Sequence, residues 1–240
     1  MSNELLSVLV LLPTAAVVIA IFAILRRAAS NAKQSRTAEV SGIVLAVWAM
    51  LAMVLAYRGF FRPPSTHSFP PIGTNLIVVF LALALCLALS SSLRSLVANQ
   101  RRLTWLHVWR LEGVVFLILM AAGQMPALWA LPAGIGDIIV GVTAPFVATR
   151  LATPGGRKLA VVFNLFGMAD LVVAVALGVM TSPGPTQVLH THPTSELVTQ
   201  FPLALVPTFL VPLAFTIHVI SLWQLLQGTW AKGSASPASA

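Results

Sequence analysis

Ionisable side chains inside long apolar runs are the residues of this sequence that could do chemistry. Five lie in such runs: Arg110, Glu112, Asp137, Asp170 and His218. A charge at the centre of a bilayer costs about 3 kcal/mol or more, so these groups are functional candidates. Together they could relay protons, bind a ligand, or form an ion pair that only fixes helix packing. The residues alone leave these three alternatives open.

Depth estimates predict which of these groups meet. At about 1.5 Å per residue, Glu112, His218 and Asp170 lie about 10, 12 and 16 Å from the inner surface. With Arg110 they are expected to form one buried polar layer, because an unpaired charge in hydrocarbon is costly. Asp137 is expected about 9 Å below the outer surface, in a different contact. His107, three residues before the arginine, is expected at the inner interface.

Two of the apolar runs share a pattern of small residues around an aspartate. Small residues lie three before and four after each one: Gly134 and Gly141 around Asp137, and Gly167 and Ala174 around Asp170. These spacings share one helix face, where small side chains let membrane helices approach closely. The pattern fits ordinary close packing, and it also fits a vestigial inverted repeat of the kind that transporters use.

Prolines interrupt the last apolar run, among them Pro207 and Pro212 ahead of His218. An interior proline removes a backbone hydrogen bond to the residue four before it. The freed carbonyls near Leu203 and Thr208 must then find donors from protein, hydroxyls or water. We expect a kinked helix that faces the bundle interior or a wet cavity, with the two prolines at a packing or gating position.

Histidines outside the apolar runs are candidates for a metal site. His190, His192 and Glu196 lie in one proline-containing connection, and His67 lies in another. In an extended segment, residues two apart point the same way, so the first two could chelate one zinc or copper ion that the others complete. Solvated turn residues are the competing interpretation.

The elements that must position these residues follow from composition. The chain has 240 residues, of which 58% are hydrophobic and 8% charged, and its mean hydropathy is +0.93. These values exclude a soluble globular domain and a disordered chain. Runs of about 20 apolar residues predict transmembrane helices. We expect an all-α fold, a single bundle in residues 1–227 followed by a disordered cytoplasmic tail at 228–240. Its seven helices are expected near 5–25, 40–57, 74–93, 105–124, 132–149, 159–180 and 202–226.

The distribution of basic residues predicts how the helices are oriented. Cytoplasmic loops of membrane proteins are enriched in Lys and Arg. Arg58 and Arg62 lie on one side of the predicted bundle, and eleven basic residues lie on the other. The eleven are Arg26, Arg27, Lys33, Arg36, Arg94, Arg101, Arg102, Arg150, Arg157, Lys158 and Lys232. This bias predicts an N-terminus outside and a cytoplasmic C-terminus.

Missing residues exclude or disfavour several function classes. A retinal Schiff base needs a lysine in the seventh helix, and the lysines are Lys33, Lys158 and Lys232. Haem held by two histidines within the bilayer is disfavoured because only His218 is expected to lie deep. The net charge of +8 is spread over short loops, so no nucleic acid is expected. The motifs of serine hydrolases, zinc proteases and P-loop pumps are absent, which favours a protein that is not an enzyme.

Two stretches resemble a known group of proteins. The sequence from Phe201 to Leu213, followed by His218, and the sequence from Pro132 to Asp137 resemble a function-unassigned family of bacterial seven-helix inner-membrane proteins. The resemblance covers the last four helices. It implies a multi-pass protein of the bacterial cytoplasmic membrane and no particular activity.

Three functions from different classes remain. A small proton-coupled transporter or ligand-binding bundle would use the polar layer. A non-catalytic accessory subunit of a larger membrane complex, or a homo-oligomer, would place its apolar side chains against lipid or partner helices. A metal- or cofactor-binding redox protein would use the outer histidines. The first function accounts for the buried charges, the prolines and the aspartate pattern together, and it is the one we expect.

Overall fold

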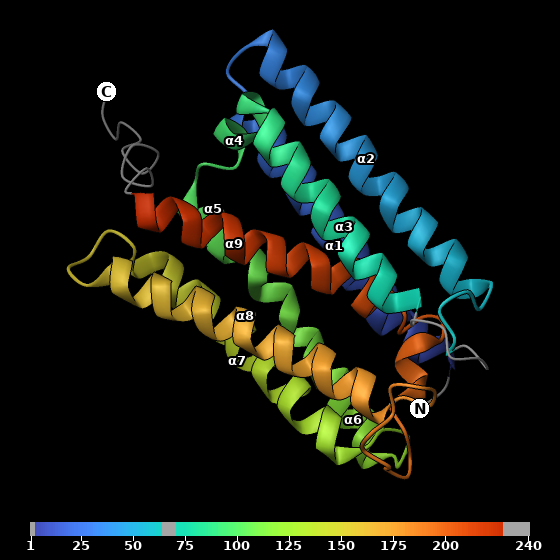
Figure 1. Ribbon diagram of the computed structural model, residues 1–240. Helices are drawn as coiled ribbons and strands as arrows, with labels where there is room; N and C mark the ends of the chain where they lie inside the picture. The colour runs from blue at the N-terminus through green and yellow to red at the C-terminus, as the bar shows by residue number, and fades with distance from the viewer. Residues whose placement is uncertain (1–2, 64–70, 228–240) are drawn as a thin grey trace.

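The computed structural model describes residues 3–63 and 71–227, and its elements are helical. Most of the described connections between them are short, whereas the one from α8 to η2, residues 182–195, is long (Figure 1). The α-helices are α1 (Asn3–Ala28), α2 (Ala32–Tyr57), α3 (Pro71–Leu89), α4 (Ser91–Leu96), α5 (Gln100–Trp105), α6 (Val114–Ala121), α7 (Ala127–Arg150), α8 (Gly156–Thr181) and α9 (Val211–Gln227). The other helices are the 3₁₀ segments η1 (Leu106–Gly113) and η2 (Glu196–Thr199) and the π-helix η3 (Val206–Leu210).

Seven spans within the described residues are long and apolar enough to cross a membrane. Five of them are the single helices α1, α2, α3, α7 and α8. The other two are composite: α5, η1 and α6 form one, and η3 and α9 form the other. The all-α fold and the predicted number of helices are thereby confirmed, and the spans indicate a multi-pass membrane protein.

Polar caps decide where several helices begin, and these positions differ from the predicted ones. α2 begins earlier than expected because Asn31 Oδ1 accepts the backbone N–H of Gln34 at 2.9 Å. α3 ends earlier because Ser90 Oγ accepts the N–H of Leu93 at 3.1 Å and so starts α4. The predicted tail at 228–240 lies outside the described residues.

The helices differ strongly in how much of their surface is buried. α9 buries residues along most of its length, whereas α3 buries only Leu76. Figure 1 shows α9 through the middle of the bundle, with α7 and α8 on one side of it and α2 and α3 on the other. The core therefore lies around α9, and α1 to α3 form a looser layer on one side.

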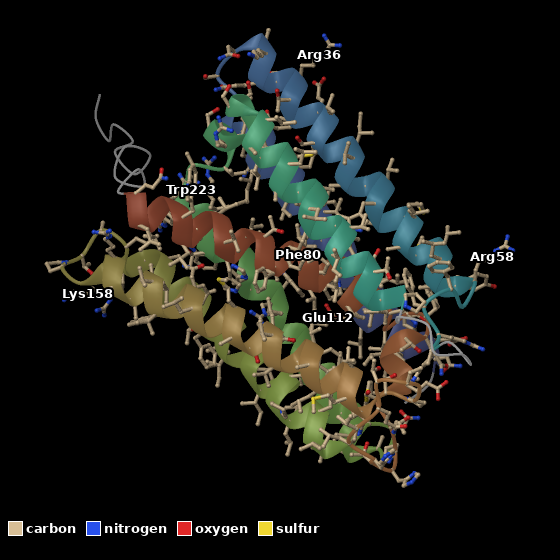
Figure 2. All side chains as sticks on the ribbon, viewed as in Figure 1. Arg36, Arg58, Phe80, Glu112, Lys158 and Trp223 are labelled. Carbon is tan, nitrogen blue, oxygen red and sulfur yellow. The ribbon has the colours of Figure 1, made fainter. Side chains whose placement is uncertain are left out.

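The two ends of the bundle differ in charge. Arg36 and Lys158 lie at one end, which we call the basic end, and Arg58 lies at the opposite end (Figure 2). At the opposite end, the connection after α8 packs against that helix. Ser195 Oγ donates to the carbonyl of Gly178 at 2.9 Å and accepts from the buried Thr181 hydroxyl at 2.8 Å. These hydrogen bonds hold this part of the connection against the end of α8.

The start of the last span contains both predicted prolines. Pro207 lies in η3 and Pro212 lies just inside α9. The second proline frees the carbonyl of Thr208, which accepts a hydrogen bond from Asn75 Nδ2 of α3 at 2.9 Å. A protein donor therefore satisfies this carbonyl. The prolines lie in and next to a π-helical turn, which is one of the features at which helices kink.

Candidate functional site

The fourth span changes helix type where its polar residues lie. In η1 the backbone is 3₁₀, a geometry in which side chains three residues apart eclipse one another. His107, Arg110 and Gly113 therefore lie in one row, and all three are buried. In an α-helix, Gly113 would be turned about 120° away from His107. The 3₁₀ segment thus directs the imidazole and the guanidinium toward the same neighbouring helices.

Arg110 is the centre of the site. Its side chain is 0% exposed. Its Nε donates to Asp137 Oδ1 of α7 at 2.5 Å, and its Nη2 donates to Asp170 Oδ2 of α8. Its Nη1 donates to the carbonyl of Gly167 at 3.4 Å and lies 3.2 Å from His218 Nε2 of α9. One guanidinium therefore connects three helices. We call Arg110, Asp137, Asp170 and His218 the charged cluster.

The hydrogen bonds of His218 determine where its proton lies. A guanidinium N–H can only donate, so His218 Nε2 accepts from Arg110 and carries no proton. The ring proton is therefore on Nδ1, which donates to Asn164 Oδ1 at 2.9 Å. The amide is oriented in turn by its Nδ2, which donates to the carbonyl of Ala160 at 2.7 Å. His218 is neutral in this arrangement.

His107 extends the cluster toward the basic end. Its ring stacks on that of His218, with centroids 3.8 Å apart and planes 15° from parallel. Within the described residues neither of its ring nitrogens has a hydrogen-bond partner. The sequence placed this residue at the inner interface, which is wrong, because the span begins at Gln100 and not near 105. The histidine lies seven residues, or about 10 Å, inside the span.

The separate position expected for Asp137 is also wrong. α7 begins at Ala127 and not near 132, so this aspartate lies ten residues, or about 15 Å, from the start of its helix. That depth matches the one estimated for Asp170. In the structure both aspartates contact Arg110, whereas the sequence analysis predicted this contact for Asp170 only.

Glu112 was expected in the polar layer, and the structure leaves it out. Two residues along a 3₁₀ helix correspond to about 240°, so Glu112 falls in a different row from Arg110. It is 8% exposed, and neither carboxylate oxygen has a hydrogen-bond partner in residues 3–63 and 71–227. Figure 2 shows Glu112 between the two ends of the bundle.

The predicted glycines lie at close contacts between neighbouring elements. A Cβ added to Gly134 would lie 2.8 Å from the carbonyl oxygen of Gly113, and one added to Gly141 would lie 2.8 Å from the backbone nitrogen of Leu111. A Cβ on Gly167 would overlap the ring of His218. Glycine at these positions lets α7 contact η1 closely and leaves room for the imidazole beside α8.

Sequence reasoning missed two residues that support the cluster. Gly136 precedes Asp137, and a Cβ at this position would overlap the carboxylate of Asp170. Asn164 orients His218 from six residues before Asp170 on the same helix. Neither belongs to the three-before, four-after pattern. An asparagine inside an apolar run is the signal that could have identified the second of them.

A small cavity reaches the cluster from the opposite end of the bundle. It has a volume of about 90 Å³ and extends from Pro63 and Ser182 to Asp137. Its walls are largely apolar and include Phe116, Trp129, Leu171 and Val175. A site of this size has space for a few water molecules. Asp137 is the charged side chain among the lining residues, and 15% of that side chain is exposed.

Polar groups also continue from the cluster toward the basic end. Ser221 follows His218 by three residues on α9, and its Oγ donates to Gln100 Oε1 at 2.7 Å. Gln100 Nε2 donates to the carbonyl of Ser221 at 2.8 Å and to Gln224 Oε1 at 3.0 Å. Gln224 Nε2 donates to the carbonyl of Val97 at 2.9 Å. Buried polar side chains therefore lie on the basic-end side of the charged cluster, and the cavity lies on the other side.

The predicted outer metal set is not assembled by its described members. His190 and His192 are exposed, and Glu196 Oε1 accepts from Gln200 Nε2 at 3.5 Å. In the part of the chain that the structure describes, no three His, Cys, Asp or Glu side chains form a group that could hold a metal ion. His67 lies outside the described residues.

The fold and the site define a multi-pass helical bundle with a charged cluster among its most buried helices. The chain belongs to the family described as a domain of unknown function, DUF8737, whose model matches residues 69–226. This agrees with the resemblance to a function-unassigned family, and the matched range contains every member of the charged cluster. Neither a curated protein nor a solved structure matches the chain.

Proposed function

We propose that the protein is a small proton-coupled transporter of the bacterial cytoplasmic membrane and that the charged cluster carries the proton. The observation that carries this proposal is the charge balance of the cluster. Arg110 supplies one positive charge, Asp137 and Asp170 supply two negative charges, and His218 is neutral. One negative charge therefore remains in surroundings where an uncompensated charge is costly. A bound proton would cancel it.

The alternative, an ion pair that only fixes helix packing, needs a single carboxylate. A second carboxylate adds desolvation cost without adding another cation. Two carboxylates on α7 and α8 instead offer Arg110 two partners. When one carboxylate takes up a proton, the guanidinium keeps a charged partner in the other. Proton binding would then change how strongly each helix is held to η1, which is the coupling that a transporter requires.

Access to the cluster supports the same function. The cavity at Asp137 supplies a path from the opposite end of the bundle. The Gln100 and Ser221 hydrogen bonds supply polar groups toward the basic end. A proton carrier needs a route on each side of its binding group, and these features offer one on each side.

Infrared titration of the purified full chain in phosphatidylcholine vesicles tests proton binding directly. The chain has six Asp and Glu residues, so carboxylic-acid bands can be assigned by substitution. We expect a band that appears on acidification of the wild type and is lost in Asp137→Asn or Asp170→Asn. Glu196→Gln is the control, because this carboxylate lies on η2 and accepts a hydrogen bond from Gln200, outside the cluster.

The proposal would be overturned if both Asn variants kept the band while remaining folded. It would also be overturned if the wild type showed no cluster band at any pH at which it stays folded. The same vesicles, loaded with a pH-sensitive dye, then report proton flux under an imposed membrane potential. We expect flux in the wild type and in Glu196→Gln, and none in either Asn variant.

The orientation that we propose places the N-terminus outside and the basic end in the cytoplasm. It follows the excess of Lys and Arg at the basic end. A reporter that is active only in the cytoplasm should give signal when it is fused after Gly228 and none when it is inserted at Ser65. The reverse result would refute this orientation.

An accessory subunit of a larger membrane complex is the second candidate function. The observation that favours it is the exposure of α3, where Ile77, Leu81, Leu85 and Leu89 are 55% to 77% exposed. Such a face contacts either lipid or another helix. Purification from native membranes in mild detergent distinguishes the two functions. A second membrane chain in fixed ratio favours the subunit, and a chain that purifies alone favours the transporter.

A further inference from the structure

A second, larger hollow lies on the other side of α9. This groove has a volume of about 700 Å³ and is lined by residues of α1, α2, α3, α4 and α9, a size within the range of small-ligand sites. The floor is formed by α9 through Leu213, Thr216, Ile217 and Ile220. On α3 the lining residues are Leu83, Cys86, Leu87 and Leu89. The groove therefore lies between α2 and α3, and the helix that forms its floor, α9, also belongs to the core.

The lining of the groove is polar at one end and apolar along the rest. At the basic end it contains Lys33 and Arg36, together with the hydroxyl side chains of Ser90, Ser91 and Ser92. Both basic side chains are exposed, and neither forms a salt bridge within the described part of the chain. Two basic side chains beside several hydroxyl groups suit a phosphate group. The apolar rest of the lining suits a hydrocarbon chain.

The length of the groove matches one leaflet of a bilayer. From Lys33 to Trp48, the lining residues of α2 span fifteen residues, or about 22 Å of helix. Half of a bilayer, with its headgroup region, is about 20 to 22 Å thick. A molecule that lies along the groove with its charged group at Lys33 would therefore reach from the membrane surface to the midplane.

We propose that the groove binds an anionic phospholipid from the leaflet at the basic end. Its headgroup phosphate contacts Lys33 and Arg36, and an acyl chain lies along α9 between α2 and α3. A partner helix fits the lining less well, because an apolar helix would leave both cations without an anion. The bound lipid also fills the space beside α3, which buries only Leu76 against protein. This inference does not depend on the proton-coupled function.

Native mass spectrometry of the full chain in detergent, titrated with phosphatidylglycerol or phosphatidylcholine, tests the headgroup. We expect phosphatidylglycerol to bind more tightly. The double variant Lys33→Ala, Arg36→Ala should weaken its binding by about thirtyfold, the loss expected for two basic side chains next to anionic lipid. The matched control is Arg150→Ala, Lys158→Ala, which removes two charges from the end of α7 and the start of α8. Neither residue lines the groove, so this variant should leave binding unchanged.

A pair of neighbouring substitutions on α3 tests the acyl chain. Cys86, the single cysteine of the sequence, lines the groove, whereas Leu85 is 58% exposed and does not line it. Cys86→Trp should abolish binding of phosphatidylglycerol, and Leu85→Trp should leave it intact. Equal binding of the two lipids, or equal effects of the two charge variants, would overturn the proposal. A dimer or a second chain that only Cys86→Trp releases would also overturn it, because a protein would then occupy the groove.

Discussion

Replacing Arg110 by methionine removes the guanidinium and leaves Asp137 and Asp170 without their shared partner. The side chain is 0% exposed, and its bond to Asp137 is 2.5 Å long, so water cannot replace it without rearrangement of the helices. Breaking a buried pair by removing one partner costs about 3 to 5 kcal/mol. Against a total stability of about 5 to 15 kcal/mol, this is a large fraction. We expect Arg110→Met to be the least stable single variant of the cluster.

Neutralising the two carboxylates should restore most of the loss. In the triple variant Arg110→Met, Asp137→Asn, Asp170→Asn the charged cluster holds no charge, and replacing a buried pair by neutral groups is often close to neutral in stability. Arg110→Lys should fall between wild type and Arg110→Met. A lysine keeps the charge, but it lacks the planar fork that lets one side chain bond to both carboxylates.

Unfolding in mixed detergent micelles, followed by the fluorescence of the six tryptophans, measures these differences. Glu112→Gln serves as the control and should cost no stability, because its carboxylate has no hydrogen-bond partner to lose within the described residues. The reasoning is refuted if Arg110→Met unfolds like the wild type. A triple variant that is no more stable than Arg110→Met would refute it as well.

Two further predictions concern the residues that support the cluster. Gly136→Ala should lower stability by about 1 to 3 kcal/mol because its methyl group overlaps the carboxylate of Asp170. Gly178→Ala, whose methyl group approaches a tryptophan nitrogen at 3.1 Å, should cost less in the same unfolding assay in mixed micelles. Nitrogen NMR of His218 should show a protonated Nδ1 and an unprotonated Nε2. Asn164→Ala should leave this tautomer in place, because Arg110 still donates to Nε2, and should cost about 1 to 3 kcal/mol, because the buried Nδ1–H loses its acceptor.

The sequence was sufficient to predict the spans and part of the site. Apolar runs of about 20 residues define helices because backbone groups in hydrocarbon must bond within the segment. The same reasoning made Arg110, Asp170 and His218 candidates for one layer, and the structure brings these three together. Hydrophobicity was enough for the spans, and the layer also needed the helical rise per residue and the cost of an unpaired charge.

Depth along each helix was harder to predict because it depends on where the helix starts. α7 begins directly after Pro126, whose extended backbone precedes the first helical residue, and α6 ends before Gly123, which has a φ of +68°. Both signals are visible in the sequence, and using them would have placed Asp137 correctly. The 3₁₀ geometry of η1 could not have been predicted in this way, but Glu112 lies off the Arg110 face in either helix type, because two residues correspond to about 200° in an α-helix and about 240° in a 3₁₀ helix.

The helix type of η1 also has a mechanical consequence. A 3₁₀ helix rises about 2.0 Å and turns about 120° per residue, against about 1.5 Å and 100° in an α-helix. If the eight residues of η1 became α-helical, the segment would shorten by about 4 Å and unwind by about 160°. Arg110 would then turn away from one aspartate while α6 moved along its own axis. A change of hydrogen-bond partner at the Arg110 guanidinium would then be coupled to movement of α6. Electron-spin distances between labels on α5 and α6, measured in the wild type and in Asp170→Asn, should differ by this amount, and equal distances would exclude the motion.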